Sequence, residues 1–129
     1  MDIIQRYFEA FNAGDPDAML DCLTDDIAHH VNEGTVRTGK AAFAKFCAHM
    51  SRCYAEELTE MVIFANADGT RGAAEYTVNG TYLATDEGLP EARGQTYCLP
   101  AGSFFTLKNG RIARVTTYYN LADWLRQVA

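Results

Sequence analysis

The sequence predicts a single α+β domain in which helices pack on one face of a strongly curved antiparallel sheet. Three observations support this prediction. Helical periodicity is concentrated in the first part of the chain, long alternating strands follow it, and hairpin turns join those strands. A chain of 129 residues has the usual length of one domain, so residues 1–129 are treated as one unit.

Three helices are expected before the long strands begin. Apolar residues recur at helical spacing over residues 3–11, and Gly14 then provides a C-terminal stop. Asp15 and Pro16 suit the cap and the first turn of a second, short helix. A third, longer helix with one apolar stripe is predicted over residues 40–54.

Alternating patterns place one short strand over residues 25–31 and a set of long strands after it. The long strands are expected at 57–65, 70–83, 95–107 and 111–119. Asn109 and Gly110 form a strong hairpin signal between the last two. Pro and Gly within residues 100–102 predict a bend, and Asn120 suits the cap of a terminal helix.

The charge balance disfavours polyanionic partners. Eleven Lys and Arg residues against 17 Asp and Glu residues give a formal net charge of −6. Such a surface repels phosphate backbones and anionic lipids, so neither nucleic acid nor a membrane is an expected partner. The chain has no apolar run long enough for a membrane helix and no signal-peptide pattern at its start, which predicts a cytoplasmic protein.

No metal or cofactor is expected from the spacing of potential ligands. None of the four cysteines is paired at the two-residue spacing of a zinc knuckle or redox motif. His29 and His30 are adjacent, and their side chains would diverge on a strand. No Gly-rich phosphate loop follows a predicted strand. The sequence therefore predicts chemistry that depends on ordinary side chains alone.

A series of short motifs runs through the first half of the chain. They are Gln5-Arg6-Tyr7, Asn12-Ala13-Gly14-Asp15, Asp25-Asp26, Thr38-Gly39 and Ala42-Phe43-x-x-Phe46. Together with the order of elements, they resemble the ketosteroid isomerase-related and SnoaL-like branch of the nuclear transport factor 2-like superfamily. The resemblance implies a cone-shaped α+β barrel around one deep apolar pocket, with homodimers forming through the outer face of the sheet.

The same resemblance implies a tyrosine that polarises a ketone and a base near the mouth of the pocket. Tyr7 matches the tyrosine without a gap, and it is a candidate catalytic residue. Ser103 falls at or beside the position of the family's second donor, a protonated aspartate, and it would be a weaker donor. This departure disfavours authentic steroid isomerisation and leaves enolisation, cyclisation or hydration open.

The position of the base differs with the way in which the sequences are aligned. Counting back from Gly39 places it at His30, whereas counting forward from residues 25–26 places it at Val31. Strand alternation instead directs His29 toward the pocket and His30 outward. Either histidine suits proton transfer near neutral pH, since the ordinary pKa of imidazole is about 6.5. Both are therefore candidate catalytic residues.

Further polar and aromatic residues are candidates for contacts with a substrate. Aromatic strand residues are expected to line part of a cavity enclosed by a curved sheet, and the turn after the short strand would lie beside it. The candidate substrate-binding residues are Asn32, Tyr76, Tyr97, Ser103 and Tyr119, with Glu33 as a further turn residue that would orient a ligand.

Three functions are compatible with these features. The first is an enzyme that needs no cofactor and carries out isomerase-, cyclase- or lyase-type proton transfer on a small apolar carbonyl compound. The second is a non-catalytic carrier or sensor of an apolar small molecule, and the third is a dimerisation module with a filled interior. A fold shared by many functions does not decide among them.

Overall fold

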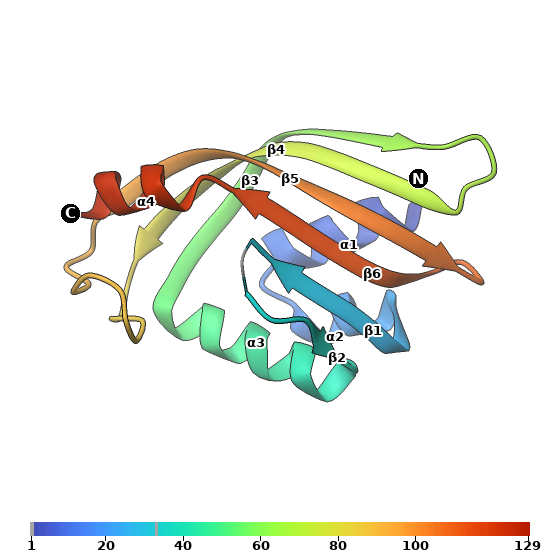
Figure 1. The fold of residues 1–129 in the computed structure, drawn as a ribbon, viewed down its shortest axis with the longest axis horizontal. Coiled ribbons are helices and arrows are strands. Elements are labelled where there is room, and N and C mark those ends of the chain that lie inside the picture. Colours follow the sequence, from blue (N-terminus) through green and yellow to red (C-terminus); the bar gives the residue numbers. More distant parts are fainter. Residues whose placement is uncertain (1, 33) are drawn as a thin grey trace.

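A computed structural model describes residues 2–32 and 34–129, and it confirms the predicted α+β class (Figure 1). Its helices are α1 (Asp2–Asn12), α2 (Pro16–Asp21), α3 (Lys40–Cys53) and α4 (Leu121–Val128). Its strands are β1 (Leu23–Val31), β2 (Arg37–Thr38), β3 (Tyr54–Ala65), β4 (Arg71–Tyr82), β5 (Thr96–Lys108) and β6 (Arg111–Tyr119). None of the helices in the described ranges is long and apolar enough to span a membrane.

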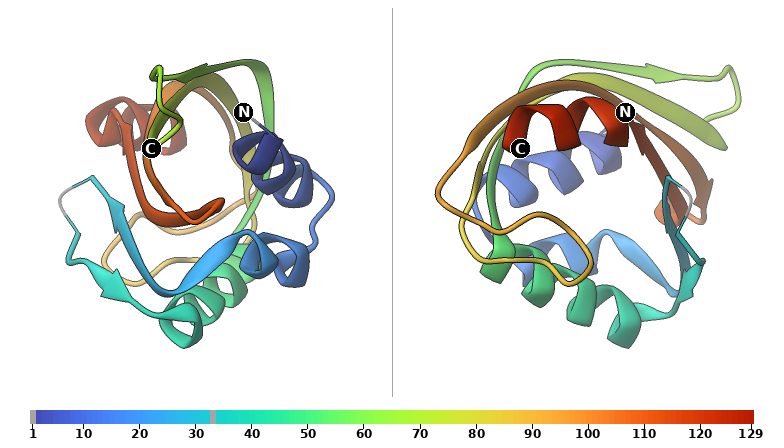
Figure 2. Two further views of the ribbon diagram at one scale, coloured as in Figure 1. Left: turned by 90° about the vertical axis from the view of Figure 1, so that its right-hand side faces the viewer. Right: turned by 60° about the vertical axis from the view of Figure 1, so that its left-hand side comes forward.

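All six strands form one sheet in the order β2-β1-β6-β5-β4-β3. The sheet curves strongly around α1, α2 and α3 (Figure 2), but it stays open because its two edge strands, β2 and β3, do not pair with each other. The expectation of a purely antiparallel sheet is wrong at one place, since β1 pairs with β6 in parallel. The long connection through α3 and the hairpins allows β1 to meet β6 in this orientation.

Local signals explain most element boundaries. The side chain of Asp15 accepts a hydrogen bond from the backbone N–H of Ala18 and caps α2 at the position before Pro16. Asn109 and Gly110 both have positive φ values, 53° and 76°, as the tight β5–β6 hairpin requires.

Two strand features differ from the sequence expectation. The β4–β5 register runs without a break through residues 100–102, so no bulge accompanies the bend predicted there. A bulge lies instead on β3, where the register against β4 shifts between Thr59 and Val62 and Glu60 has a φ of 56°. Moreover, β3 begins at Tyr54, directly after α3, and not at residue 57.

The terminal elements close the ends of the curved sheet. At the end of α1, the amide of Asn12 bonds both the backbone N–H and the carbonyl of Leu58 on β3, each at 2.9 Å. On α4, the side chain of Gln127 bonds the backbone of Cys98 on β5, and Trp124 packs edge-on against Tyr82. These contacts fix the helices relative to the concave face of the sheet.

Candidate functional site: a cavity between helices and sheet

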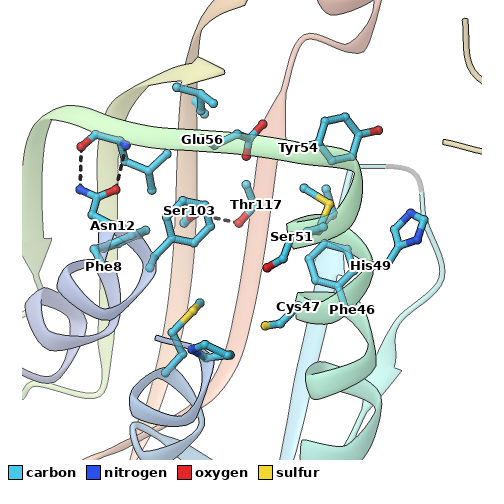
Figure 3. Close-up of a pocket in the computed structure, with 18 of the residues that line it drawn as sticks. Phe8, Asn12, Phe46, Cys47, His49, Ser51, Tyr54, Glu56, Ser103 and Thr117 are labelled. Carbon is cyan, nitrogen blue, oxygen red and sulfur yellow. Dashed lines mark hydrogen bonds between the residues drawn. The ribbon is translucent and has the colours of Figure 1, made fainter. Parts of the chain in front are cut away.

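The concave face of the sheet and the helices enclose a cavity of about 660 Å³. This volume lies within the range of small-molecule sites. Its wall is mostly apolar and aromatic, with Phe8 from α1 and Phe46 from α3 as examples (Figure 3). Leu58 from β3 also lines it. A few polar side chains interrupt this wall, and their positions determine what the cavity could bind or transform.

Glu56 is the carboxylate that β3 brings to the cavity wall (Figure 3). The hydroxyl of Tyr97, on β5, donates a hydrogen bond of 2.6 Å to its Oε2 atom. Burial raises the pKa of Glu56 above its ordinary value, and the hydrogen bond from Tyr97 opposes part of that increase. Among the described residues, none is hydrogen-bonded to Oε1, which leaves that oxygen available to a ligand.

Three hydroxyl groups form a chain on the same side of the cavity. The hydroxyl of Tyr76 lies 2.8 Å from that of Ser103, which in turn lies 2.8 Å from the Thr117 hydroxyl. All three residues line the cavity. Because three O–H groups share two hydrogen bonds, one proton remains to be donated to a ligand. The chain can therefore offer a donor to a carbonyl or enolate oxygen.

Tyr7 also reaches the cavity, as predicted from its place on the first helix. Its ring packs edge-on against Phe8 and Phe105, and burial raises the pKa of its phenol strongly. The hydrogen bonds between described residues include none to its hydroxyl. Tyr7 thus stays a protonated phenol that is free to donate to a ligand.

The two candidate histidines lie on opposite sides of β1. His29 lines the cavity and is 4% exposed, whereas His30 is not among the residues that line it. The arrangement follows the strand alternation, which also places Val31 on the cavity wall. Burial, followed by the nearby Arg37, lowers the pKa of His29 to about 4. His29 is therefore neutral, and its Nδ1 atom has no hydrogen-bond partner among the described residues.

The other predicted substrate contacts divide into two groups. Tyr76, Ser103 and Tyr119 line the cavity, as expected. Tyr97 and Asn32 are not among its lining residues. Tyr97 instead donates a hydrogen bond to Glu56, which does line the cavity. The candidate turn residue Glu33 lies outside the described residues.

Asn32 has a role in the turn after β1. It has a positive φ of 48°, and its side-chain oxygen accepts a hydrogen bond from the backbone N–H of Tyr119. Its own N–H donates to the carbonyl of Thr117. These bonds join the end of β1 to the end of β6, so the side chain of Asn32 is occupied away from the cavity.

A second polar group stands at the β4–β5 loop. One oxygen of Asp86 accepts a hydrogen bond of 2.7 Å from the hydroxyl of Tyr54, and the other lies 2.9 Å from the Nε2 atom of His49. These three residues line the cavity. The hydroxyl of Tyr82 accepts a bond from the Asp86 N–H and donates to the carbonyl of Pro90. The loop is thus anchored to α3, β3 and β4.

Sequence reasoning missed Glu56 because it placed the start of the strand at residue 57. The alternation could have found Glu56, since Leu58 is buried and Glu56 is two residues before it on the same side. The hydrogen-bond partner of Glu56, by contrast, is Tyr97 on β5, and a contact between residues so far apart in the chain leaves no local signal.

Comparisons with known proteins agree with this architecture. The chain matches the SnoaL-like domain family over residues 4–115. It is 73% identical to a candidate polyketide cyclase from Silicibacter sp. TM1040, with a TM-score of 0.98, 99% of this chain covered and 93% of the other. A candidate polyketide cyclase from Pseudomonas putida KT2440 is 57% identical, with a TM-score of 0.97 and coverages of 98% and 96%.

More distant structures share the fold alone. An LEH-like epoxide hydrolase from Mycobacterium tuberculosis is 16% identical, with a TM-score of 0.72 and coverages of 98% and 86%. No curated protein matches the chain. The family match covers most of the chain, and its solved relatives include proteins of the nuclear transport factor 2-like fold. The chain therefore belongs to the SnoaL-like family, with a nuclear transport factor 2-like fold.

Proposed function

We propose that this protein is an acid–base catalyst that removes a proton next to the carbonyl group of a small, largely apolar compound. The resulting chemistry would be of the cyclase, isomerase or lyase type. The observation that carries the proposal is Glu56, a carboxylate on the cavity wall with a raised pKa and a hydroxyl donor at one oxygen. Candidate polyketide cyclases among the similar structures support the same class of reaction.

Glu56 replaces the histidines as the proposed base. A general base works best when its pKa lies near the working pH, and burial raises the pKa of Glu56 toward that range. Burial lowers the pKa of His29 to about 4, away from the working pH, so the imidazole is a weak base. The Tyr97 hydroxyl restrains the Glu56 carboxylate and leaves its other oxygen to accept the proton.

The negative charge that develops on the substrate oxygen would be stabilised by protonated hydroxyls. Tyr7 and the Tyr76–Ser103–Thr117 chain are the donors on this cavity. Burial keeps the phenols of Tyr7 and Tyr76 protonated by raising the pKa of each. Fixed donors in a dry cavity stabilise an oxyanion more than the same donors in water would.

The proposal can be tested with a nitrobenzisoxazole, an apolar probe whose ring opens when a base removes one C–H proton. The released phenolate is coloured, so a rate can be measured without knowing the natural substrate. We expect turnover by the wild-type protein and a loss of about 100-fold or more in Glu56→Gln, the usual scale for a general base.

Glu57→Gln provides the matched control, because Glu57 is the next residue on β3 and is exposed on the other face. It should retain the wild-type rate. The other outcome is that the wild-type protein binds the nitrobenzisoxazole, with a rise in its melting temperature, and yet opens the ring no faster than a free carboxylate in solution does. That result would instead identify a carrier of apolar ligands. Equal rates for Glu56→Gln and Glu57→Gln would contradict the assignment of the base.

We also propose that two copies associate through the outer face of the sheet. Four large apolar residues are about half exposed there: Val62, Phe64, Phe104 and Tyr118. The strand registers place them on the same face, and the rings of Phe104 and Tyr118 lie 6.0 Å apart. Light scattering should give a dimer for the wild-type chain and a monomer for Phe104→Lys. A wild-type monomer at micromolar concentration would contradict this proposal.

A further inference from the structure

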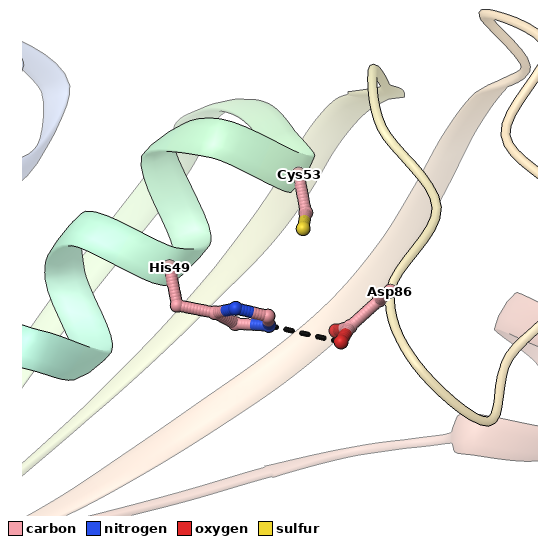
Figure 4. A group of neighbouring side chains, drawn as sticks. All are labelled: His49, Cys53 and Asp86. Carbon is pink, nitrogen blue, oxygen red and sulfur yellow. Dashed lines mark hydrogen bonds and ion pairs between the residues drawn. The ribbon is translucent and has the colours of Figure 1, made fainter.

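A cluster of three potential metal ligands lies at the start of the β4–β5 loop (Figure 4). His49 and Cys53 come from α3, Asp86 comes from the loop, and one ligand atom from each lies within 4.8 Å of the other two. We propose that His49, Cys53 and Asp86 bind a thiophilic divalent cation of the Zn²⁺ type. This site is separate from the proposed base and does not depend on the proposed function.

The backbone brings these residues together from two parts of the chain. His49 and Cys53 are four residues apart on α3, so their side chains lie on the same face of the helix. The N–H groups of Leu83 and Ala84 donate to the carbonyl of Cys53 at 2.8 and 3.3 Å. These bonds hold the start of the loop over the end of α3, and Asp86 follows two residues later.

Cys53 lies in an unusual position for a structural cysteine. It is completely buried, yet it is not part of the main hydrophobic cluster, and its thiol makes no hydrogen bond with the described residues. A buried free cysteine ordinarily packs as a small apolar group. Here its sulfur instead faces an imidazole and a carboxylate, which is the environment that suits a thiolate ligand.

The protonation of His49 is defined by its neighbours. The Nη2 atom of Arg52 lies 3.3 Å from Nδ1, and a guanidinium group can only donate, so Nδ1 is the acceptor. The proton therefore resides on Nε2 and is donated to Asp86 at 2.9 Å.

A cation would replace this shared proton. The Nε2 atom of His49 becomes a ligand, its proton moves to Nδ1, and the exposed side chain of Arg52 turns away. Cys53 loses its thiol proton to solvent, because only the thiolate is a strong ligand. One thiolate and one carboxylate then balance the 2+ charge, so burial of the ion leaves no net charge at the site.

The geometry needs only a small adjustment. Tetrahedral Zn²⁺ with bonds of about 2.0 to 2.3 Å places its ligand atoms roughly 3.3 to 3.6 Å apart. The present separations of up to 4.8 Å would contract by about 1.2 to 1.5 Å. The Tyr54 hydroxyl already holds the second oxygen of Asp86, as outer-shell groups do at metal sites. His49 and Asp86 also line the cavity, which offers an entry path and room for a fourth ligand.

Cobalt(II) absorption tests the site in the folded 129-residue chain, because a Co²⁺–thiolate bond gives a charge-transfer band in the near ultraviolet. We expect one Co²⁺ per chain, with displacement of the band by Zn²⁺. The nearly isosteric Cys53→Ser should abolish the band, and Asp86→Asn should weaken Co²⁺ binding at least tenfold, the scale typical of lost metal-site groups. Cys98→Ser, which changes an exposed cysteine, should retain both.

Circular dichroism of the metal-free variants checks that the fold is intact, and Zn²⁺ should raise the melting temperature of the wild-type and Cys98→Ser proteins only. A missing charge-transfer band in the wild-type protein would overturn the proposal. A band that survives in Cys53→Ser, or that disappears equally in Cys98→Ser, would overturn it as well. Ring opening of the nitrobenzisoxazole is not part of this test, so the two proposals fail independently.

Discussion

The two sides of the cavity differ in what burial does to a titratable group. On the β1–α3 side, His29 packs edge-on against Phe43 and Phe46, and burial lowers its pKa to about 4. On the β3–β5 side, burial raises the pKa of Glu56, and Tyr97 holds the carboxylate in place. The same physical effect removes the charge from a base on one side and strengthens a base on the other.

This difference teaches that the type of residue alone is a poor guide to a catalytic base. A histidine titrates near neutral pH only when its surroundings leave it solvated or paired with an acid. His29 meets neither condition, since its side chain is buried and its Nδ1 atom has no hydrogen-bond partner among the described residues. The ordinary pKa of a glutamate is too low for a base at neutral pH, yet burial raises the pKa of Glu56 toward that range.

The largest expected effect separates the two candidate bases directly. Glu56→Gln should lower kcat/KM for the nitrobenzisoxazole by about 100-fold or more, whereas His29→Gln should change it less than about threefold. The wild-type rate should fall as pH decreases through a single pKa above 4.5, and His29→Gln should keep that inflection. An inflection that disappears in His29→Gln would show that His29, and not Glu56, is the base.

The next effect concerns the pH dependence of stability. His29 has a pKa of about 4 when folded and 6.5 as its ordinary value, so the unfolded chain binds the extra proton between these pH values. The free energy of unfolding should therefore fall as pH decreases from 6.5 to 4, with a contribution from His29 of up to about 3 kcal/mol.

Urea unfolding at several pH values measures this contribution as the difference between variants. His29→Gln should flatten the pH dependence in that window relative to the wild-type protein. Equal slopes for the wild-type protein and His29→Gln would show that His29 does not titrate differently on folding.

A third prediction concerns the packing behind Glu56. Gly80 and Tyr97 face each other on β4 and β5, and a Cβ atom on Gly80 would collide with the ring of Tyr97. Gly80→Ala should therefore lower the free energy of unfolding by roughly 1–3 kcal/mol. At Gly102 the nearest obstacle to a Cβ is the Ala74 carbonyl oxygen at 3.5 Å, so Gly102→Ala is the milder control. Thermal and urea unfolding measure this loss. Equal decreases in the free energy of unfolding for Gly80→Ala and Gly102→Ala would show that the contact with the Tyr97 ring is not the cause.

The smallest effect sharpens the role of Tyr97. Removal of its hydroxyl in Tyr97→Phe takes away the hydrogen bond that lowers the pKa of Glu56, so the inflection in the pH–rate profile should move to higher pH. The plateau rate should fall by up to about tenfold, because the carboxylate is less well positioned. Tyr118→Phe changes an exposed tyrosine and should alter neither quantity. A shift to lower pH would contradict the assignment.

The order of the elements and most of their boundaries could be predicted from the sequence, since they depend on local physics. Helical spacing over residues 3–11 and 40–54, the cap at Asp15 and the turn at Asn109 act within a few residues of where they occur. The alternation of β1 likewise identified which histidine faces inward. Each of these features depends on backbone geometry that neighbouring residues determine.

Contacts between distant strands were decided only by the tertiary structure. Glu56 becomes a candidate base because Tyr97, 41 residues later, meets its carboxylate, and His49 meets Asp86 across 37 residues. The parallel pairing of β1 with β6 has the same origin. Burial and partnership set a pKa, and both depend on which segments the curved sheet brings together, so no local pattern in the sequence could reveal them.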